Sequence, residues 1–189
     1  MGLEPSVGAE SIDGVGKFDF GKTKFVSEEF FANMARGHIR DGDVLIYKDG
    51  GKPGELRPSV SYVSNNFPFD RFCINEHVFR ARSDGVDQAL LYCLLSTDQA
   101  FAQMRELATG VAQPGLNQVQ MGRLSFVLPK DKVLLDQTAS ILKTLIDACN
   151  VNASESRTLA QTRDLLLPRL MSGELRVTEV APTEKEIAV

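Results

Sequence analysis

The chain has 189 residues, of which 43% are hydrophobic and 24% charged, and a formal net charge of -4. This composition is typical of one globular domain with a sizeable core plus an appendage, and it lacks the roughly eighteen uninterrupted apolar residues of a membrane helix. Most nucleic-acid-binding proteins have a basic surface that displaces counterions from the phosphates. The negative net charge of this chain therefore argues against nucleic-acid binding.

The front of the chain predicts a turn that leads into a strand. Residues 37–43 contain glycines and aspartates suited to a turn, and residues 44–47 are apolar, as in a buried strand. The glycine loop at 48–54 follows at once and carries Lys48 and Lys52. Its amines suit contact with phosphate oxygens, although a solvated hairpin turn explains the same composition. It lacks the Gly-Lys-Ser/Thr of a P-loop, so we do not expect ATP binding.

The middle of the chain predicts a strand over 72–82 and then an apolar-periodic helix over 88–108, with Cys93 and Met104 as packing residues. A strand followed by a helix indicates a mixed α/β domain.

Basic residues gather in the segment from Lys48 to Arg82, whereas residues 178–189 form an acidic tail that we expect to be flexible. A local basic face is therefore compatible with the negative total; its members are Lys48, Lys52, Arg57, Arg71, Arg80 and Arg82.

A loop rich in amide side chains follows the predicted helix and leads into a predicted strand over 124–128. Asn and Gln present a donor and an acceptor together, which matches the major-groove edge of adenine. An ordinary polar loop explains the same residues, and the sequence leaves both interpretations open. The candidate DNA contacts here are Gln113, Asn117 and Gln118, with Arg123 as a nearby phosphate or guanine contact.

Residues 131–177 predict a long helix, with Asp131 as its N-cap, a break or kink at Pro168 and a glycine terminus at Gly173. Its apolar residues recur at the spacing of one helix face. Such a stripe is more often core than coiled coil, and polar residues from Asn150 to Ser156 weaken it. We expect the face to pair with a partner helix through Leu134, Ile141, Leu145, Leu159 and Leu166.

Several motifs carry a family resemblance. They are the Leu-Pro that ends the run before the long helix, Gln137 near its start, the closing Arg-x-x-Leu-Leu-x-x-Leu-x-Ser-Gly-x-Leu at 163–175, and the segments 42–54, 75–82 and 108–117. The chain resembles type I restriction-modification specificity subunits. The resemblance implies an α+β fold: a target-recognition domain over 1–130, then a coiled-coil-type helix over 131–177.

The resemblance also implies a function. The domain would read one half of a bipartite site on double-stranded DNA, and the helix would pair with another such helix and set the half-site spacing. A full subunit resembles two domains and two helices, so we expect a half-subunit or a fragment, whose recognition domain lacks a first segment ahead of residues 2–5. The subunit is not catalytic and needs no cofactor, since methyltransferase and restriction subunits supply the chemistry.

An enzyme interpretation would need His38 or His77 as a base beside Cys73 or Cys93. Sequence spacing does not bring these residues together, and neither histidine has metal-ligand spacing, so we predict no catalytic or metal site. Three cysteines without a Cys-x-x-Cys pair or a signal peptide indicate free, mostly buried thiols in the reducing cytoplasm. A truncated interaction protein, which associates through its helix without specific DNA binding, is the alternative function.

Overall fold

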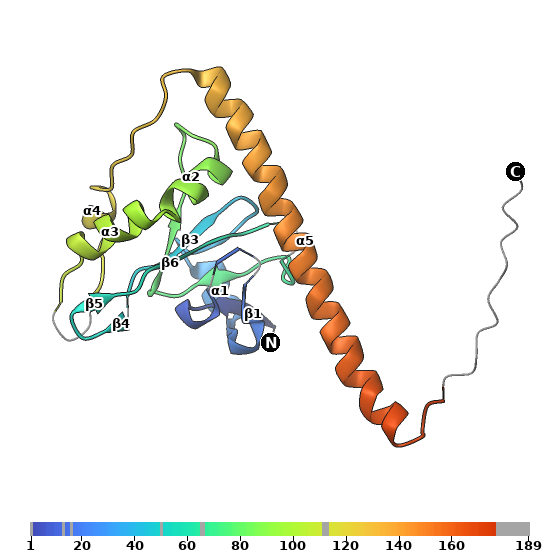
Figure 1. Cartoon of the computed structure of the whole chain (residues 1–189). Helices are drawn as coiled ribbons and strands as arrows, with labels where there is room; N and C mark the ends of the chain where they lie inside the picture. Colours follow the sequence, from blue (N-terminus) through green and yellow to red (C-terminus); the bar gives the residue numbers. More distant parts are fainter. Residues whose placement is uncertain are drawn as a thin grey trace, which may run out of the picture. The chain divides into compact units, whose positions relative to one another are not determined.

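The computed structural model describes residues 2–12, 14–15, 17–49, 51–64, 67–110 and 114–176. The chain divides into two compact units, Met1–Ala153 and Ser154–Val189. The first contains small sheets, short helices and the start of the long C-terminal helix, and the second contains the rest of that helix (Figure 1). The predicted α+β class with a long helix is confirmed.

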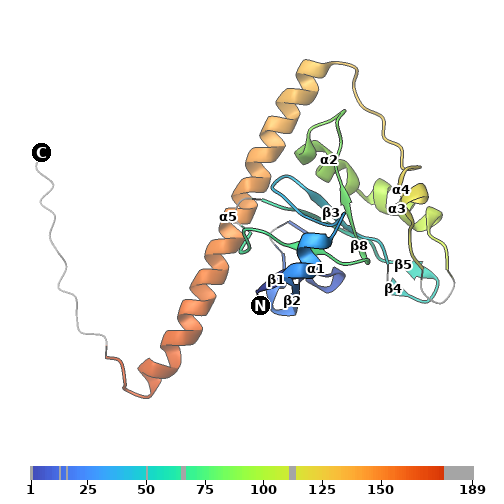
Figure 2. The same ribbon diagram turned by 180° about the vertical axis from the view of Figure 1, so that it is seen from behind.

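A three-stranded sheet lies at the start of the chain, in the order β2-β1-β7. Strand β1 is antiparallel to β2 and parallel to β7, and α1 packs against β1 and β2 (Figure 2). Helix α1 begins where the Ser27 hydroxyl accepts a hydrogen bond from the Phe30 amide at 3.2 Å. The elements are β1 (Leu3–Val7), the 3-10 helices η1 (Ala9–Ser11) and η2 (Phe20–Lys22), β2 (Lys24–Ser27), α1 (Glu28–Asn33) and β7 (Cys73–Ile74).

A second three-stranded sheet separates two hydrophobic clusters. Because side chains alternate along a strand, Val44 and Ile46 of β3 pack into one cluster and Leu45 packs into the other. All three are at most 1% exposed, so β3 is buried on both faces, as its apolar sequence predicts. β3 (Val44–Tyr47) lies between β6 (Ser59–Tyr62) and β8 (Val78–Ala81), both antiparallel to it, and the hairpin of β4 (Gly51–Lys52) and β5 (Glu55–Leu56) follows β3.

The predicted helix over 88–108 is wrong in its continuity, because it consists of α2 (Gln88–Leu95) and α3 (Asp98–Leu107). The break falls at Ser96 and Thr97, whose hydroxyls each donate to a backbone carbonyl of the preceding turn. Thr97 also caps α3 by accepting a hydrogen bond from a backbone amide. Hydroxyl side chains compete in this way with helical backbone bonds. Met104 packs in the first cluster as predicted, and Cys93 packs against it.

The predicted strand over 72–82 is interrupted, because its ends, β7 and β8, belong to different sheets. Between them, the Asn75 side chain accepts a hydrogen bond from the His77 amide at 3.1 Å. The Asn75 carbonyl accepts one from the Val78 amide at 3.2 Å. Asparagine favours such turns because its side chain replaces a backbone acceptor. His77 therefore lies in a turn, not in a strand.

The predicted strand over 124–128 is also absent, since these residues, which follow α4 (Gln118–Met121), join no sheet. The amide and carbonyl of Ser125 bond to the Gln103 side chain, each at 3.0 Å. A glutamine side chain thus satisfies the backbone groups that a neighbouring strand would otherwise pair.

The long helix α5 (Lys132–Met171) begins where the sequence predicts. The Asp131 carboxylate accepts hydrogen bonds from the Val133 and Leu134 amides at 2.9 and 3.2 Å. These are amides that an uncapped helix leaves without partners, and a negative charge also suits the helix N-terminus. The cap therefore fixes the first turn.

The predicted break at Pro168 is absent, because α5 continues through this residue to Met171. Proline removes one backbone donor, but the Pro168 carbonyl still accepts a hydrogen bond from the Ser172 amide at 3.0 Å. The chain leaves the helix at Gly173, whose φ of 74° suits glycine and closes the segment as predicted. The predicted tail, residues 178–189, lies outside the described residues.

The apolar residues in the first part of α5 occupy two faces, not the single face that their spacing predicts. Leu142 and Ile146 pack against the first hydrophobic cluster, and Ile146 is 5% exposed. A 40-residue helix with apolar residues at adjacent positions can present one stripe to the domain and a second stripe to solvent. The second stripe contains Leu134, Ile141 and Leu145, which are 48%, 63% and 58% exposed.

Candidate nucleic-acid interface

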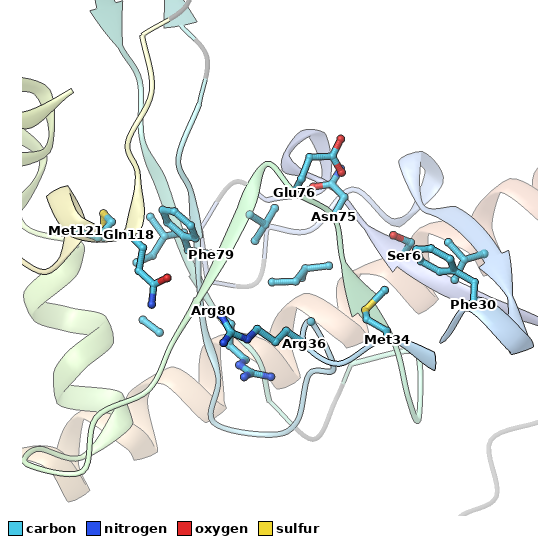
Figure 3. A pocket seen from close by; sticks show the side chains of 16 residues that line it. Ser6, Phe30, Met34, Arg36, Asn75, Glu76, Phe79, Arg80, Gln118 and Met121 are labelled. Atoms are coloured by element: carbon cyan, nitrogen blue, oxygen red, sulfur yellow. The ribbon is translucent and has the colours of Figure 1, made fainter. Parts of the chain in front are cut away.

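A cleft of about 870 Å³ opens in the first unit (Figure 3). Its walls come from β1, β2, β3, β7 and β8, from α1 and the residues after it, from the turn between β7 and β8, and from α4. Much of the lining is apolar, including Ile46, Phe79 and Met121. Apolar walls with a few polar groups are the usual form of a ligand-binding site. The polar lining residues are Ser6, Arg36, Asn75, Glu76, Arg80 and Gln118.

Two arginines bring guanidinium groups to this cleft. Arg80 belongs to β8 and Arg36 follows α1, and both line the cleft together with Gln118 (Figure 3). One Arg80 nitrogen, Nη1, donates to the His38 carbonyl at 2.5 Å, which uses one of the five guanidinium donors. Within the described ranges, neither arginine has a carboxylate partner. Such groups suit an anion, and phosphate in particular, because a guanidinium binds it bidentately.

Other basic residues of the predicted basic segment are bound to carboxylates. Lys48 donates to Asp49 at 2.9 Å, and its ammonium also lies 5.3 Å from the centre of the Phe79 ring. Arg82 donates twice to Asp43, at 2.5 and 2.8 Å, and the Asp43 side chain is 1% exposed. The hydrogen bond to Asp43 raises the pKa of Arg82. These two cations stabilise the backbone around β3, and their charge is already neutralised.

Strands β4 and β5 form a hairpin after β3, and residues 52–55 of this hairpin are exposed. Lys52 lies in β4, and Arg57 follows β5 with its guanidinium 3.7 Å from the Glu55 carboxylate. Gly54 supplies the turn at a φ of 80°, which glycine adopts without strain. Lys52 and Arg57 are exposed and neither lines the cleft. The structure therefore places these two predicted contacts away from the arginine pair.

In the predicted amide loop, some side chains form hydrogen bonds within the protein and others do not. Asn117 and Gln120 form a capping box at α4: the Asn117 side chain accepts from the Gln120 amide at 2.9 Å, and the Gln120 side chain accepts from the Asn117 amide at 2.7 Å. Gln120 also donates to the Thr109 hydroxyl at 3.3 Å. The Asn117 side-chain oxygen, a predicted DNA contact, therefore serves to begin α4.

Gln118 is exposed and lines the same cleft as Arg36 and Arg80. Its side chain forms no hydrogen bond with other residues that the structure describes. Arg123 is exposed outside the cleft lining, and Gln113 lies outside the described residues. Of the predicted DNA contacts, the structure thus brings Gln118 into the cleft.

Asp49 and Lys48, at the end of β3, contact the loop before α4. The Leu116 amide donates to the Lys48 carbonyl at 2.9 Å, and Gly115 approaches Asp49 so closely that a Cβ there would lie 2.5 Å from a carboxylate oxygen. His77 donates from Nδ1 to Asp49 at 2.8 Å. Burial raises the Asp49 pKa, but the hydrogen bonds from His77 and Lys48 outweigh it and hold the pKa below its ordinary value. The charged carboxylate helps to position α4.

The predicted partner-helix residues are all solvent-exposed. Leu134, Ile141 and Leu145 lie in the first unit, and Leu159 and Leu166 in the second unit are 69% and 36% exposed. The five residues follow one another at intervals close to multiples of 3.5, which is the repeat of a coiled-coil seam. Exposed leucines at this repeat are suited to a second helix.

The backbones of His38 and Cys73 form an isolated β-bridge, but the two side chains have different partners. The Cys73 thiol is buried, lies 3.6 Å from the Pro5 carbonyl, and has a pKa raised by burial, which disfavours the reactive thiolate. The His38 ring lies 2.9 Å from the Met34 carbonyl and 4.6 Å from the Phe31 ring. Each histidine thus contacts a group other than the thiol.

The sequence does not reveal the arginine pair as a site. Arg80 was visible as one member of the basic segment, but nothing distinguished it from the neighbouring arginines that carboxylates neutralise. Arg36 carries no local signal, because it joins the cleft only through the packing of α1 on the first sheet. Selecting basic residues that have no acidic residue near them in the sequence would also have failed to identify Arg80. Glu76 is only four positions away and also lines the cleft.

No protein-family model and no curated protein sequence matches this chain. Among the helices of the described residues, none has the length and apolar character needed to cross a membrane.

Proposed function

We propose that this chain is the DNA sequence-specificity subunit, or half-subunit, of a type I restriction-modification complex in the cytoplasm. It recognises one half of a bipartite target on double-stranded DNA and docks the methyltransferase and restriction subunits. The observation that carries the proposal is the meeting of Arg36, Arg80 and Gln118 at one cleft. Phosphate contacts position a protein on the duplex, and base-edge contacts specify the sequence. The cleft contains side chains suited to each task.

The motifs at 42–54, 75–82, 108–117 and 163–175 support the same proposal through their resemblance to specificity subunits. Three of these segments line the cleft or fix its walls: 42–54 contains Ile46, 75–82 contains Arg80, and 108–117 contains Gly115, which packs on Asp49. The resemblance and the cleft are independent reasons, because the motifs depend on the sequence alone and the cleft depends on the fold.

The net charge of -4 shapes the proposal. A chain with this charge gains little nonspecific attraction to DNA, so the partner subunits supply much of the phosphate contact and this chain mainly reads bases. No catalytic step or cofactor is assigned to it, because methylation and cleavage belong to those subunits. Strong, salt-insensitive DNA binding by the isolated chain would contradict this division.

Helix α5 supplies the assembly surface in this proposal. Its exposed leucines pair with a second specificity half or a second copy of the chain, and the length of the paired helices sets the spacing between half-sites. A symmetric dimer predicts an interrupted palindrome as the DNA target. Sedimentation as a clean monomer at micromolar concentration, both alone and with DNA, would exclude the symmetric dimer.

The test is co-purification of the full chain with a type I methyltransferase subunit, followed by binding-site selection from random duplex DNA at moderate salt. We expect a stable complex and enrichment of a two-part motif. The matched control is the methyltransferase subunit alone, carried through the same selection, which should enrich no motif. Failure of both co-purification and enrichment would overturn the proposal.

A second candidate is an interaction protein that associates through α5 without reading DNA. The exposed stripe of Leu134, Ile141 and Leu145 favours it, because that surface needs a partner whether or not the cleft binds DNA. Stable co-purification together with a selection that enriches no motif would establish this candidate in place of the first.

A further inference from the structure

The amide groups of the cleft are not equivalent. Asn75 lines the cleft, but its side-chain oxygen accepts the His77 amide in the turn before β8. The Asn117 oxygen is engaged in the capping box, and Gln120 is 8% exposed with both of its amide groups engaged. Gln118 lines the cleft with its oxygen and nitrogen both uncommitted among the described residues.

The backbone that carries Gln118 is held at both ends of its loop. The capping box fixes the first turn of α4, and the contact of Gly115 with Asp49 fixes the residues before it. A side chain on a restrained backbone loses less conformational freedom when it binds, so its contacts contribute more to discrimination. Gln118 is therefore an exposed, uncommitted amide on a restrained backbone.

We propose, resting on the DNA-binding function above, that Gln118 is a specificity-determining residue of this chain and that it reads adenine. A glutamine amide donates to adenine N7 and accepts from adenine N6 in the major groove, which requires both amide groups to be uncommitted. Arg36 and Arg80 hold the adjacent phosphates on the same cleft. The pairing accounts for about 5- to 150-fold preference for adenine at one position of the target.

The test is a change of specificity, not a loss of binding. Gln118→Glu replaces the amide nitrogen by a second acceptor, which cannot donate to adenine N7 but can accept from the cytosine N4 amine. The variant and the wild-type chain are each co-purified with a type I methyltransferase subunit and used for selection from random duplex DNA. The control is Gln99→Glu, which adds the same charge at an exposed position of α3 outside the cleft lining.

The expected result is a single changed position: adenine is enriched by the wild-type complex and by the Gln99→Glu complex, and cytosine by the Gln118→Glu complex. Gln118→Ala should flatten the preference at that position while the rest of the motif persists. An unchanged motif in both Gln118 variants would overturn this inference and leave the DNA-binding function intact. Failure of the wild-type complex to enrich any motif would overturn the function itself.

Discussion

The arginine at the edge of β8 and the arginines of the cleft are chemically identical but have opposite surroundings. Arg82 donates twice to the buried Asp43 carboxylate, whereas Arg36 and Arg80 have no carboxylate partner among the described residues. The first arrangement satisfies a buried charge and fixes the backbone beside β3. The second leaves positive charge at a cavity without a described counterion, although Arg80 also donates one hydrogen bond to the His38 carbonyl.

The count of basic residues alone is a poor guide to an anion-binding site. Lys48, Arg57, Arg71 and Arg82 all contribute to the basic segment of the sequence, and each is paired with a nearby carboxylate. A phosphate must compete with that carboxylate for each of them. The pairing state of a cation therefore matters more than its position in a charged run.

The largest expected effect comes from removing the buried ion pair. Arg82→Ala leaves the Asp43 carboxylate buried with only the Arg40 amide among its described hydrogen-bond donors, so the free energy of unfolding should fall by about 4 kcal/mol. Arg36→Ala should change it by less than about 0.5 kcal/mol, because no described partner is lost. Urea unfolding followed by circular dichroism measures both. Equal losses in the two variants would remove the distinction between structural and site arginines.

The two faces of α5 give the next effect. Ile146 is 5% exposed in the first hydrophobic cluster, so Ile146→Ala should lower the free energy of unfolding by about 3 kcal/mol. Ile141 is 63% exposed, so Ile141→Ala should leave monomer stability within about 0.5 kcal/mol and weaken association with a partner helix. Urea unfolding and sedimentation equilibrium separate the outcomes. Unchanged association in Ile141→Ala would place the partner surface elsewhere.

The elements that local chemistry determines could be predicted from the sequence. The apolar run of β3 and the Asp131 cap of α5 each depend on a few adjacent residues, and both are where the sequence places them. The break at Thr97 was missed because two hydroxyls outweigh the apolar periodicity around them. Pro168 does not break α5, because the other backbone hydrogen bonds of this long helix outweigh the one that proline removes.

The site could be predicted only in part, because its geometry depends on long-range contacts. Gln118 was identified from its side-chain type, but the role of Asn117 as a cap depends on where α4 starts. The pairing of Arg82 with Asp43 joins residues 39 positions apart, through the pairing of β3 with β8. Sequence alone therefore does not separate Arg80, which faces the cleft, from Arg82, which is neutralised.

The smallest effect concerns the carboxylate that holds the loop before α4. Asp49 has a folded pKa below its ordinary value of 3.8, so its stabilising contribution is present above that value and is lost as the pH falls through the folded pKa. Asp49→Asn should cost about 1 kcal/mol of unfolding free energy at neutral pH. The difference from wild type should shrink below about pH 4. Urea unfolding at several pH values measures it, and a constant difference down to pH 2 would contradict the assignment.

The most direct test of the cleft is the salt dependence of DNA binding by the complex with a methyltransferase subunit. Each phosphate contact contributes about 0.9 to the slope of log K against log salt concentration. The double variant Arg36→Ala, Arg80→Ala should therefore reduce the magnitude of the slope by about 1.8, while Arg57→Ala, which removes a paired and exposed cation outside the cleft, should leave it unchanged. An unchanged slope in the double variant, or an equal reduction in Arg57→Ala, would show that the cleft arginines do not contact DNA phosphate.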